Sequence, residues 1–290
     1  MTQDPKTPSA AVPDEAETPY RHHRRFDRMA RLVGDAGLLR LKRAHVLVVG
    51  LGGVGSFAAE ALARSGIGKL TLVDFDRVCV TNTNRQLQAM RGTVGKLKAQ
   101  VLADRLALIH PQLVLSVVPR FYDAATSGVI LSCEPDFVVD AIDNLSAKGH
   151  LLATCKENGL RVVTALGAAG RSDPFALRLD DLSQTRIDPM AQEVRKILRT
   201  KWGFPKDGPF GIPSVYSIER PKPPCDVQFD GEDGFSCVCP GGNNDHHSCE
   251  KRRLIYGTAS FVTGSFGLAC ASVVVNQLSG VPTSAGSTHD

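Results

Sequence analysis

Residues 50–56, Gly-Leu-Gly-Gly-Val-Gly-Ser, decide the fold of this chain. They follow residues 45–49, His-Val-Leu-Val-Val, an apolar run that is typical of a strand buried on both faces. A helix is expected over residues 58–65 and a second strand over residues 69–74. The glycines therefore occupy the first turn of a βαβ unit, where bare backbone can approach a phosphate at the start of a helix.

The same alternation continues along the chain. Apolar spacing predicts helices over residues 97–109 and 145–158, and short apolar runs predict strands over residues 113–118, 137–140 and 161–166. Alternating strands and helices favour an α/β fold with a Rossmann-like, doubly wound and mostly parallel sheet. Ligands of such sheets bind beyond the carboxyl ends of the strands.

The pattern changes after about residue 170. An amphipathic helix around residues 190–198 is followed by a Pro-, Gly- and Cys-rich stretch and by a small-residue helix at 258–278. We interpret this part as an elaboration packed on the same sheet. The expected organisation is a disordered tail (1–19), one domain (20–280) with a nucleotide-binding core (20–170) and a substrate-side elaboration (171–280), and a flexible tail (281–290).

The composition describes a soluble globular protein. Of the 290 residues, 42% are hydrophobic and 22% are charged, which is too apolar for a disordered chain. The net charge is +4, and residues 1–19 hold one Lys and four acidic residues, so the rest of the chain is more basic than the total. This balance permits a polyanionic partner without requiring one.

The sequence favours a cytoplasmic location. No charged-then-apolar export signal opens it, so most thiols are expected to be reduced. Residues 258–278 are long enough to suggest a membrane span, but they mix Ser, Thr, Asn and Gln with small apolar residues. We expect a buried core helix there, and no membrane partner.

The glycine spacing points to a nucleotide. Gly50, Gly52 and Gly55 fit the G-x-G-x-x-G pattern, and Asp74 ends the next strand, where its carboxylate could hold ribose hydroxyls. Taken alone, this pattern fits NAD or FAD as readily as ATP.

Three further positions favour ATP. Arg85, in the segment Thr-Asn-Thr-Asn-Arg-Gln at 81–86, and Lys98, near the start of the following helix, would neutralise phosphate charge. Asp143 follows the fourth strand and could hold Mg²⁺, which prefers carboxylate and phosphate oxygens. All of these positions follow strand ends or lie near helix starts, so they can converge on one pocket. The set suits attack on the α-phosphate of ATP better than hydride transfer.

These motifs, in this order, resemble the adenylation domain of ubiquitin-activating enzymes and of the bacterial molybdopterin-synthase and thiamine-carrier adenylyltransferases. The likeness covers about residues 25–170. It implies that Asp143 chelates Mg²⁺. It also implies that ATP is bound by Gly50, Gly52, Gly53, Gly55, Asp74, Asn82, Arg85 and Lys98.

The resemblance further implies a homodimer. Arg28 belongs to the segment Arg-Phe-Asp-Arg at 25–28, on a helix expected over residues 26–41. In the family, the second arginine of such a segment reaches the triphosphate bound by the partner subunit. The catalytic residues implied in this way are Arg28, Arg85, Lys98 and Asp143.

The second half narrows the family. Carrier-protein adenylyltransferases often have paired Cys-x-x-Cys zinc ligands, and this sequence contains no Cys-x-x-Cys. Segments at 181–185, 188–190, 194–199, 214–221 and 257–264 instead resemble the tRNA threonylcarbamoyladenosine dehydratase branch of the superfamily. That likeness implies ATP-dependent adenylation of the carboxylate on the modified base. A neighbouring group of the same modification then closes a ring with net loss of water, so no enzyme nucleophile is obligatory.

Three other interpretations stay open. An adenylyltransferase of a ubiquitin-like sulfur-carrier protein would share the ATP site and differ in its acceptor. A nicotinamide-dependent oxidoreductase would use the same glycines but would leave Arg85, Lys98 and Asp143 without a role. A non-catalytic scaffold that binds RNA or a partner protein would not need Lys98.

Basic side chains are distributed suitably for a tRNA partner, because phosphate contacts position RNA without reading its sequence. They form three clusters, at Arg21, Arg24 and Arg25, at Arg195, Lys196, Arg199 and Lys201, and at 251–253.

The cysteines fall into two groups. Cys225, Cys237, Cys239 and Cys249 share a polar loop with His246 and His247, which are enough ligands for zinc, although the spacing is not that of a standard zinc finger. A reactive or sulfur-carrying thiol is the alternative, with Cys249 preferred, and it would imply a sulfur-transfer partner protein. The others, expected to be small core residues, are Cys79, Cys133, Cys155 and Cys270.

Overall fold

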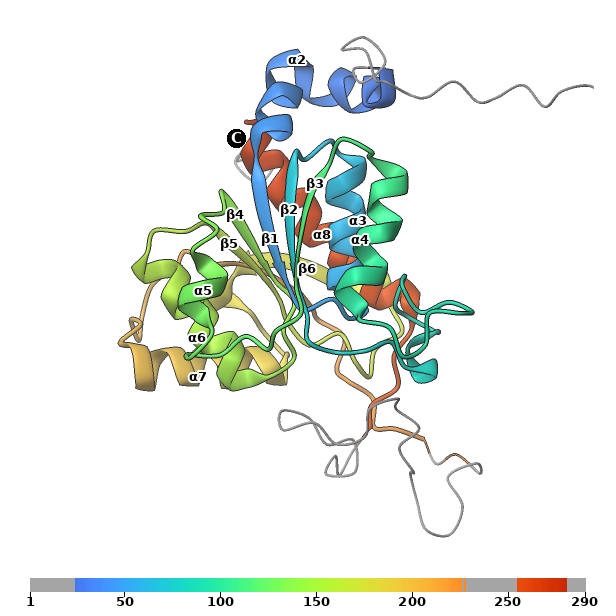
Figure 1. The fold of residues 1–290 in the computed structure, drawn as a ribbon. Coiled ribbons are helices and arrows are strands. Elements are labelled where there is room, and N and C mark those ends of the chain that lie inside the picture. The colour runs from blue at the N-terminus through green and yellow to red at the C-terminus, as the bar shows by residue number, and fades with distance from the viewer. Residues whose placement is uncertain (1–23, 226, 228–254, 281–290) are drawn as a thin grey trace, which may run out of the picture.

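The apolar run His45–Val49 forms β1, an inner strand of a seven-stranded sheet (Figure 1). The computed structural model describes residues 24–225, 227 and 255–280, so the expected tails at 1–19 and 281–290 lie outside the described residues. The strand order is β3-β2-β1-β4-β5-β7-β6. The other strands are β2 (Lys69–Val73), β3 (Val114–Val118), β4 (Phe137–Asp140), β5 (Val162–Ala165), β6 (Leu177–Asp181) and β7 (Pro213–Ser217).

The sheet is parallel except at one edge. β1 pairs in parallel with β2 and β4, and its Val46 lies opposite Leu70 and Phe137. Among the strands of the described residues, only β6 runs antiparallel, beside β7. The predicted α/β sheet is therefore confirmed, and β6 and β7 confirm the elaboration on the same sheet after residue 170.

Helices cover both faces of the sheet and bury two apolar clusters against it (Figure 1). On one face lie α3 (Gly55–Arg64), α4 (Lys98–Ile109) and α8 (Ser260–Ser279). On the other lie α5 (Ser127–Leu131), α6 (Leu145–Glu157) and α7 (Pro189–Trp202). Short 3₁₀ helices occupy connections in the described part of the chain: η1 (Val80–Asn82), η2 (Pro174–Ala176) and η3 (Leu182–Gln184).

The N-terminal helix α2 (Asp27–Arg43) leads directly into the amino end of β1. The predicted helix over residues 26–41 is thus present, but Gly34 interrupts it with φ 72° and ψ 165°. A glycine adopts this backbone conformation without the steric penalty that a side chain would bring.

The small-residue helix α8 is a core helix, as predicted. It is long and apolar enough to cross a membrane, with a mean hydropathy of 1.4, yet 61% of that window is buried inside the protein. Its glycines allow close packing on α3. A Cβ atom on Gly267 would overlap the carbonyl oxygen of Val54, and one on Gly264 would lie 3.0 Å from the ring of Phe57.

Candidate active site

The predicted site residues gather at the carboxyl ends of three adjacent strands. β1 runs into the glycine loop (residues 50–55), β2 ends just before Asp74, and β4 is followed by Asp143. Helix α4, which begins at Lys98, returns to the same edge of the sheet. The fold therefore brings these residues together because their strands are neighbours and point the same way.

Three glycines of the loop are required by the protein's own packing. Gly50 has φ 87°, and a Cβ atom on it would lie 2.7 Å from the carbonyl oxygen of Ala141. A Cβ atom on Gly55 would overlap the Gly50 carbonyl oxygen, and one on Gly53 would lie 2.9 Å from Thr263 Oγ1. The turn and the start of α3 thus have no room for side chains at these positions.

Gly52 differs from the other glycines of the loop. The nearest atom to a Cβ placed on it is Gln86 Nε2, at 3.9 Å. Within the described part of the chain, no acceptor takes the backbone N–H of Gly52 or Gly53, and the N-cap residue of α3, Val54, makes no side-chain cap. Open space beside unbonded N–H groups at a helix start is a site for an anion such as phosphate.

Asp74 is tied to the glycine loop. Its Oδ2 accepts the Leu51 N–H at 2.7 Å and its Oδ1 accepts the Asp76 N–H at 2.8 Å. The side chain is almost fully buried, and this burial raises the pKa of Asp74 although Lys98 opposes the shift. A carboxylate has about four lone-pair sites, so these two bonds leave capacity to accept from a ligand hydroxyl.

Lys98 is a buried cation among carboxylates. Its Nζ lies 2.8 Å from Asp76 Oδ2. Burial alone would lower the pKa of Lys98, but Asp74, Asp76 and, more weakly, Asp143 outweigh it and raise the pKa above its ordinary value. The ammonium is therefore charged at neutral pH. The sequence pointed to Lys98 but assigned no role to its partner Asp76.

Arg85 lies against the glycine loop, and Asn82 supports the segment that carries it. A Cβ atom on Gly53 would lie 3.3 Å from Arg85 Cγ, while Arg85 Nη1 donates to the Thr81 carbonyl oxygen at 2.8 Å. Asn82 is buried, and its Oδ1 accepts the Cys79 N–H at 3.0 Å. In this structure the Asn82 side chain holds the polypeptide turn at η1.

Asp143 and Asn144 have different surroundings. Asp143 is exposed beyond β4, close enough to Lys98 for its charge to raise the pKa of that lysine. Asn144 caps α6, since its Oδ1 accepts the Ala147 N–H at 3.0 Å. Among the described residues, no group of three or more His, Cys, Asp or Glu side chains could hold a metal. One carboxylate beside a phosphate site fits Mg²⁺, which protein sites bind through one or two carboxylates together with ligand phosphates.

Arg28 is remote from the glycine loop of its own chain. It is exposed on α2, three residues after Arg25, whose Nη1 donates to the carbonyl oxygen of Ile109 at 3.3 Å. Ile109 ends α4 and Lys98 begins it, and a helix of this length places its ends about 18 Å apart. The structure brings the other residues predicted to bind ATP and Mg²⁺ together, but it leaves Arg28 at the opposite end of α4.

A buried ion pair behind the site was missed by the sequence analysis. Lys148 Nζ lies 2.6 Å from Asp140 Oδ2, and neither side chain has exposed surface. Asp140 Oδ1 also accepts the Ile142 N–H at 3.1 Å, in the loop that leads to Asp143. The available signal was an acidic residue that ends a buried apolar strand, followed eight positions later by a lysine in an apolar helix.

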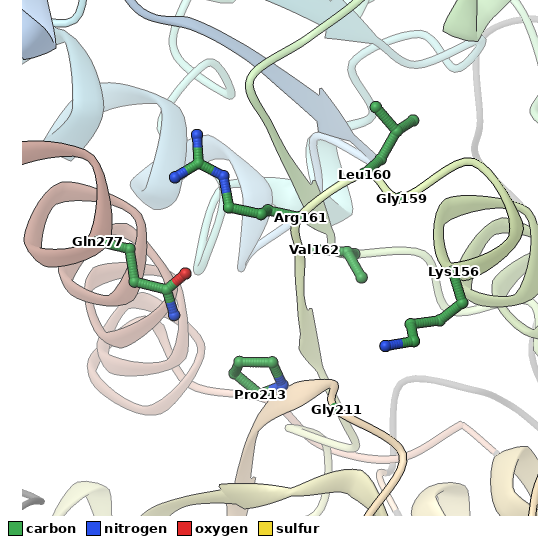
Figure 2. Close-up of a pocket in the computed structure, with 8 residues that line it drawn as sticks. All are labelled: Lys156, Gly159, Leu160, Arg161, Val162, Gly211, Pro213 and Gln277. Carbon is green, nitrogen blue, oxygen red and sulfur yellow. The ribbon is translucent and has the colours of Figure 1, made fainter.

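A cleft of about 270 Å³ lies elsewhere, at the amino ends of β5 and β7. Lys156 and Gln277 approach it from α6 and α8, and Arg161 precedes β5 (Figure 2). The predicted ATP-binding residues follow the opposite ends of the strands. This cleft is therefore separate from the candidate active site.

The structure describes some of the predicted cysteines and basic residues, and the others lie outside the described residues. Cys79, Cys155 and Cys270 are buried and Cys133 is half-buried, in agreement with a core role. Cys225 is exposed, whereas Cys237, Cys239, Cys249, His246 and His247 lie outside the described residues, as do Arg21 and the basic cluster at 251–253.

The basic face of α7 is smaller than the sequence suggested. Arg195 donates to the carbonyl oxygen and the hydroxyl of Thr185, and Arg199 donates to the carbonyl oxygens of Pro205 and Lys206. Both guanidinium groups thus hold neighbouring loops. Lys196 and Lys201 remain exposed on this helix.

Comparison with known proteins gives the same assignment as the motifs. The ThiF family pattern matches residues 26–289. The chain is 39% identical over 259 residues to the tRNA threonylcarbamoyladenosine dehydratase of Haemophilus influenzae, which covers 89% of this chain and 94% of that protein. The Escherichia coli molybdopterin-synthase adenylyltransferase is 39% identical over 115 residues, or 40% of this chain and 46% of that protein.

Solved structures of dehydratases also match this chain. The crystal structure of Escherichia coli tRNA N6-threonylcarbamoyladenosine dehydratase in complex with AMP matches with a TM-score of 0.78 at 36% identity, covering 90% of this chain and 96% of that chain. The same enzyme in complex with ATP matches with a TM-score of 0.76 at the same identity and coverage. On the family match and on these relatives, the chain belongs to the ThiF family.

Proposed function

We propose that this protein is an ATP-dependent tRNA threonylcarbamoyladenosine dehydratase. The observation that carries the proposal is the likeness to dehydratases along nearly the whole chain, at more than 30% identity and including the part after residue 170. The likeness to a molybdopterin-synthase adenylyltransferase covers less than half of the chain. The acceptor is therefore assigned as tRNA and not as a carrier protein.

The reaction has two steps. The free carboxylate of the threonylcarbamoyl group attacks the α-phosphorus of ATP, so that pyrophosphate leaves and an acyl adenylate forms. A neighbouring group of the same modification then attacks the acyl carbon, AMP leaves with the former carboxylate oxygen, and the ring closes. The base loses one water in total, while ATP becomes AMP and pyrophosphate. Intramolecular attack is favoured by proximity, so the protein need not supply a nucleophile.

The glycine loop and two cations would bind the triphosphate. Among the described residues, the N–H groups of Gly52 and Gly53 have no acceptor, a Cβ atom on Gly52 would enter open space, and Arg85 lies against the same loop. Lys98 is charged at neutral pH and held in place by Asp76. These fixed positive groups would stabilise the negative charge that builds up on phosphate oxygens as pyrophosphate leaves. Asp74, at the end of β2, would accept hydrogen bonds from the ribose hydroxyls.

Asp143 would hold Mg²⁺ against the phosphates. Its exposed carboxylate lies within electrostatic range of Lys98, and the described residues around it form no closed metal cage. When bound, the metal would neutralise phosphate charge. The contribution of this chain is one carboxylate on the loop that Asp140 holds by accepting the Ile142 N–H.

Arg28 would complete the site of a partner subunit in a homodimer. Its exposure, and its position at the far end of α4 from Lys98, support a role in a second copy of the chain. Mixing the Arg28→Ala and Lys98→Ala proteins tests this arrangement. Half of the randomly mixed dimers contain one intact composite site, so the mixture should recover about a quarter of wild-type activity. Two inactive proteins that stay inactive after exchange of subunits would contradict it.

The tRNA would contact exposed basic side chains such as Lys196 and Lys201. Phosphate contacts of this kind give binding that weakens steeply with salt. A tRNA substrate would be consistent with a cytoplasmic location of the enzyme. The polar loop with Cys225, Cys237, Cys239 and Cys249 is proposed either to bind zinc or to receive sulfur from a partner protein.

The decisive experiment is mass spectrometry of tRNA nucleosides. Threonylcarbamoyladenosine-containing tRNA is incubated with the protein, ATP and Mg²⁺. The tRNA is then digested to nucleosides, and their masses are measured. We expect the modified nucleoside to lose the mass of one water with the wild type, but not with Lys98→Ala or Asp143→Ala. An unchanged nucleoside, with AMP formed only when a small carrier protein is added, would replace the tRNA assignment by carrier adenylation.

A further inference from the structure

Gln88 is completely buried beside the glycine loop. Its amide nitrogen donates to the Leu51 carbonyl oxygen at 2.6 Å and lies 3.3 Å from Gln86 Oε1. The Leu51 carbonyl oxygen can only accept a hydrogen bond, so the end of the Gln88 side-chain amide that faces it is the nitrogen. The residue belongs to none of the ATP-binding motifs.

The other end of the same amide has no partner. Within the part of the chain that the structure describes, Gln88 Oε1 is buried without a hydrogen bond. An unpaired buried acceptor destabilises a fold, and an apolar side chain of similar length would not carry this penalty. The useful end of the glutamine is therefore its nitrogen, and its main partner is Leu51.

The hydrogen bond from Gln88 sets the orientation of the peptide between Leu51 and Gly52. No described peptide bond is cis, and the C=O and N–H of a trans peptide point in opposite directions. Because the Leu51 oxygen is turned inward onto Gln88, the Gly52 N–H points away from the core. The preceding peptide is fixed as well, since the Leu51 N–H donates to Asp74 Oδ2 at 2.7 Å.

Gly52 lies at an open position of the loop. Gly52 is half-buried, no atom lies closer than 3.9 Å to a Cβ placed on it, and its N–H has no acceptor among the described residues. An inward carbonyl held by a buried donor and an outward N–H beside free space are two consequences of the same peptide orientation.

We propose that Gln88 is a positioning residue of the phosphate site, which holds the Leu51–Gly52 peptide so that the Gly52 N–H donates to a phosphate oxygen of ATP. Gln88 itself does not touch the nucleotide. The inference rests on the proposed function, because it takes ATP as the ligand of the loop. It adds a residue from behind the loop whose loss would weaken phosphate binding and spare nucleoside binding.

The test compares ATP with adenosine. Gln88→Met keeps the length of the side chain and removes the donor, and both ligands are titrated into the full-length protein by calorimetry. We expect affinity for ATP to fall about tenfold and affinity for adenosine to change by less than about twofold, because one phosphate hydrogen bond is lost. Equal losses for both ligands, or unchanged ATP affinity in a folded variant, would overturn the proposal.

Gln88→Glu supplies a readout that a merely structural role would not move. At high pH its carboxylate repels the Leu51 oxygen, whereas the protonated acid can donate to it. ATP affinity of this variant, relative to wild type, should therefore rise as the pH falls from about 8 to about 6, since burial beside a carbonyl raises a carboxyl pKa. A ratio that is flat with pH in a folded variant would count against the proposal.

Thr93→Val is the matched control. Thr93 Oγ1 lies 2.7 Å from the backbone oxygen of Gln88 and 2.8 Å from that of Met90, either of which can accept its single proton, and no hydrogen bond joins Thr93 to Leu51 or to the Gln88 side-chain amide among the described residues. The ATP affinity of Thr93→Val should equal that of the wild type. If the Gln88 variants fail to fold, NMR of the wild type decides, because the Gly52 amide proton must shift with ATP and not with adenosine. A wild-type protein that binds no ATP would overturn the proposed function itself.

Discussion

Lys148 and Asp140 form an ion pair that is closed to solvent, with Lys148 Nζ 2.6 Å from Asp140 Oδ2. The lysine also donates to Thr164 Oγ1 at 3.1 Å and to the Ala165 carbonyl oxygen at 2.9 Å. Asp140 ends β4, and Thr164 and Ala165 end β5, so the pair joins the carboxyl ends of two neighbouring strands. The loop to Asp143 follows β4, and the segment that leads to η2 follows β5.

Removing one member of this pair should destabilise the protein strongly. Lys148→Met leaves the Asp140 carboxylate buried and uncompensated, which is expected to lower the free energy of unfolding by about 3–5 kcal/mol. Urea unfolding at neutral pH measures this loss. Asp140→Asn combined with Lys148→Met removes both charges and should regain part of it. A single variant as stable as wild type would show that the pair contributes little.

Substitutions at Gly52 and Gly55 should affect different properties, ATP affinity at Gly52 and stability at Gly55. Gly52→Ala adds a methyl group into open space, so its stability should stay within about 1 kcal/mol of wild type. The same methyl group occupies the expected phosphate position, and ATP affinity should fall at least about tenfold. Calorimetric titration with ATP and urea unfolding measure the two effects.

Gly55→Ala is the contrasting variant. Its Cβ atom would overlap the Gly50 carbonyl oxygen, so the start of α3 has to move. We expect a loss of about 2–5 kcal/mol in the free energy of unfolding. If instead Gly52→Ala is the unstable variant and Gly55→Ala the stable one, the assignment of the open position in the loop is wrong.

Asp143 and Asn144 are neighbours with separable roles. Asp143→Ala alters an exposed carboxylate, so stability should change by less than about 0.5 kcal/mol while dehydration falls about a hundredfold. Asn144→Ala removes the N-cap of α6 and should lower stability by about 1 kcal/mol. Initial rates of nucleoside dehydration at varied Mg²⁺, together with thermal unfolding, compare the pair. Loss of Mg²⁺ dependence in Asn144→Ala alone would reverse the assignment.

The core of the fold could be predicted because its signals are local. Strands β1, β2 and β4 are short apolar runs that end at Val49, Val73 and Asp140, and a helix follows each of them within the predicted rhythm. β6 gave no such signal, since its central residues are exposed at the sheet edge and carry Arg178 and Asp180. Its place is decided by antiparallel pairing with β7, a contact between segments more than 30 residues apart in the chain.

The candidate site likewise contains residues that could be predicted from the sequence and residues that only the folded structure reveals. Lys98 was predicted because a lysine near a helix start is visible in the sequence, whereas its partner Asp76 becomes evident only when β2 and α4 meet. Gln88 resembles any polar loop residue until the fold buries it against the Leu51 carbonyl. A sequence motif indicates which residues can contact a ligand. The side chains that orient those residues come from long-range packing and carry no fixed spacing.

Glu219 holds the loop at Ser172 and Asp173 through hydrogen bonds to its carboxylate. The Asp173 N–H donates to Oε2 at 2.8 Å, the Ser172 N–H donates at 3.0 Å, and Lys222 Nζ lies 3.2 Å from Oε1. Led by the Asp173 N–H, these groups lower the pKa of Glu219 to about 2 from 4.5. Because the folded pKa lies below the ordinary value, the folded state favours the carboxylate.

The stability from Glu219 should therefore depend on pH with a defined sign. It is fully present above pH 4.5 and is lost as the pH falls toward about 2, where the folded protein also takes up the proton. Glu219→Gln should be less stable than wild type at neutral pH, and the gap should narrow on acidification because the amide does not titrate. Thermal unfolding of both proteins across this window measures the difference, in which the other carboxylates cancel. Two parallel stability curves would show that these hydrogen bonds do not favour the ionised form.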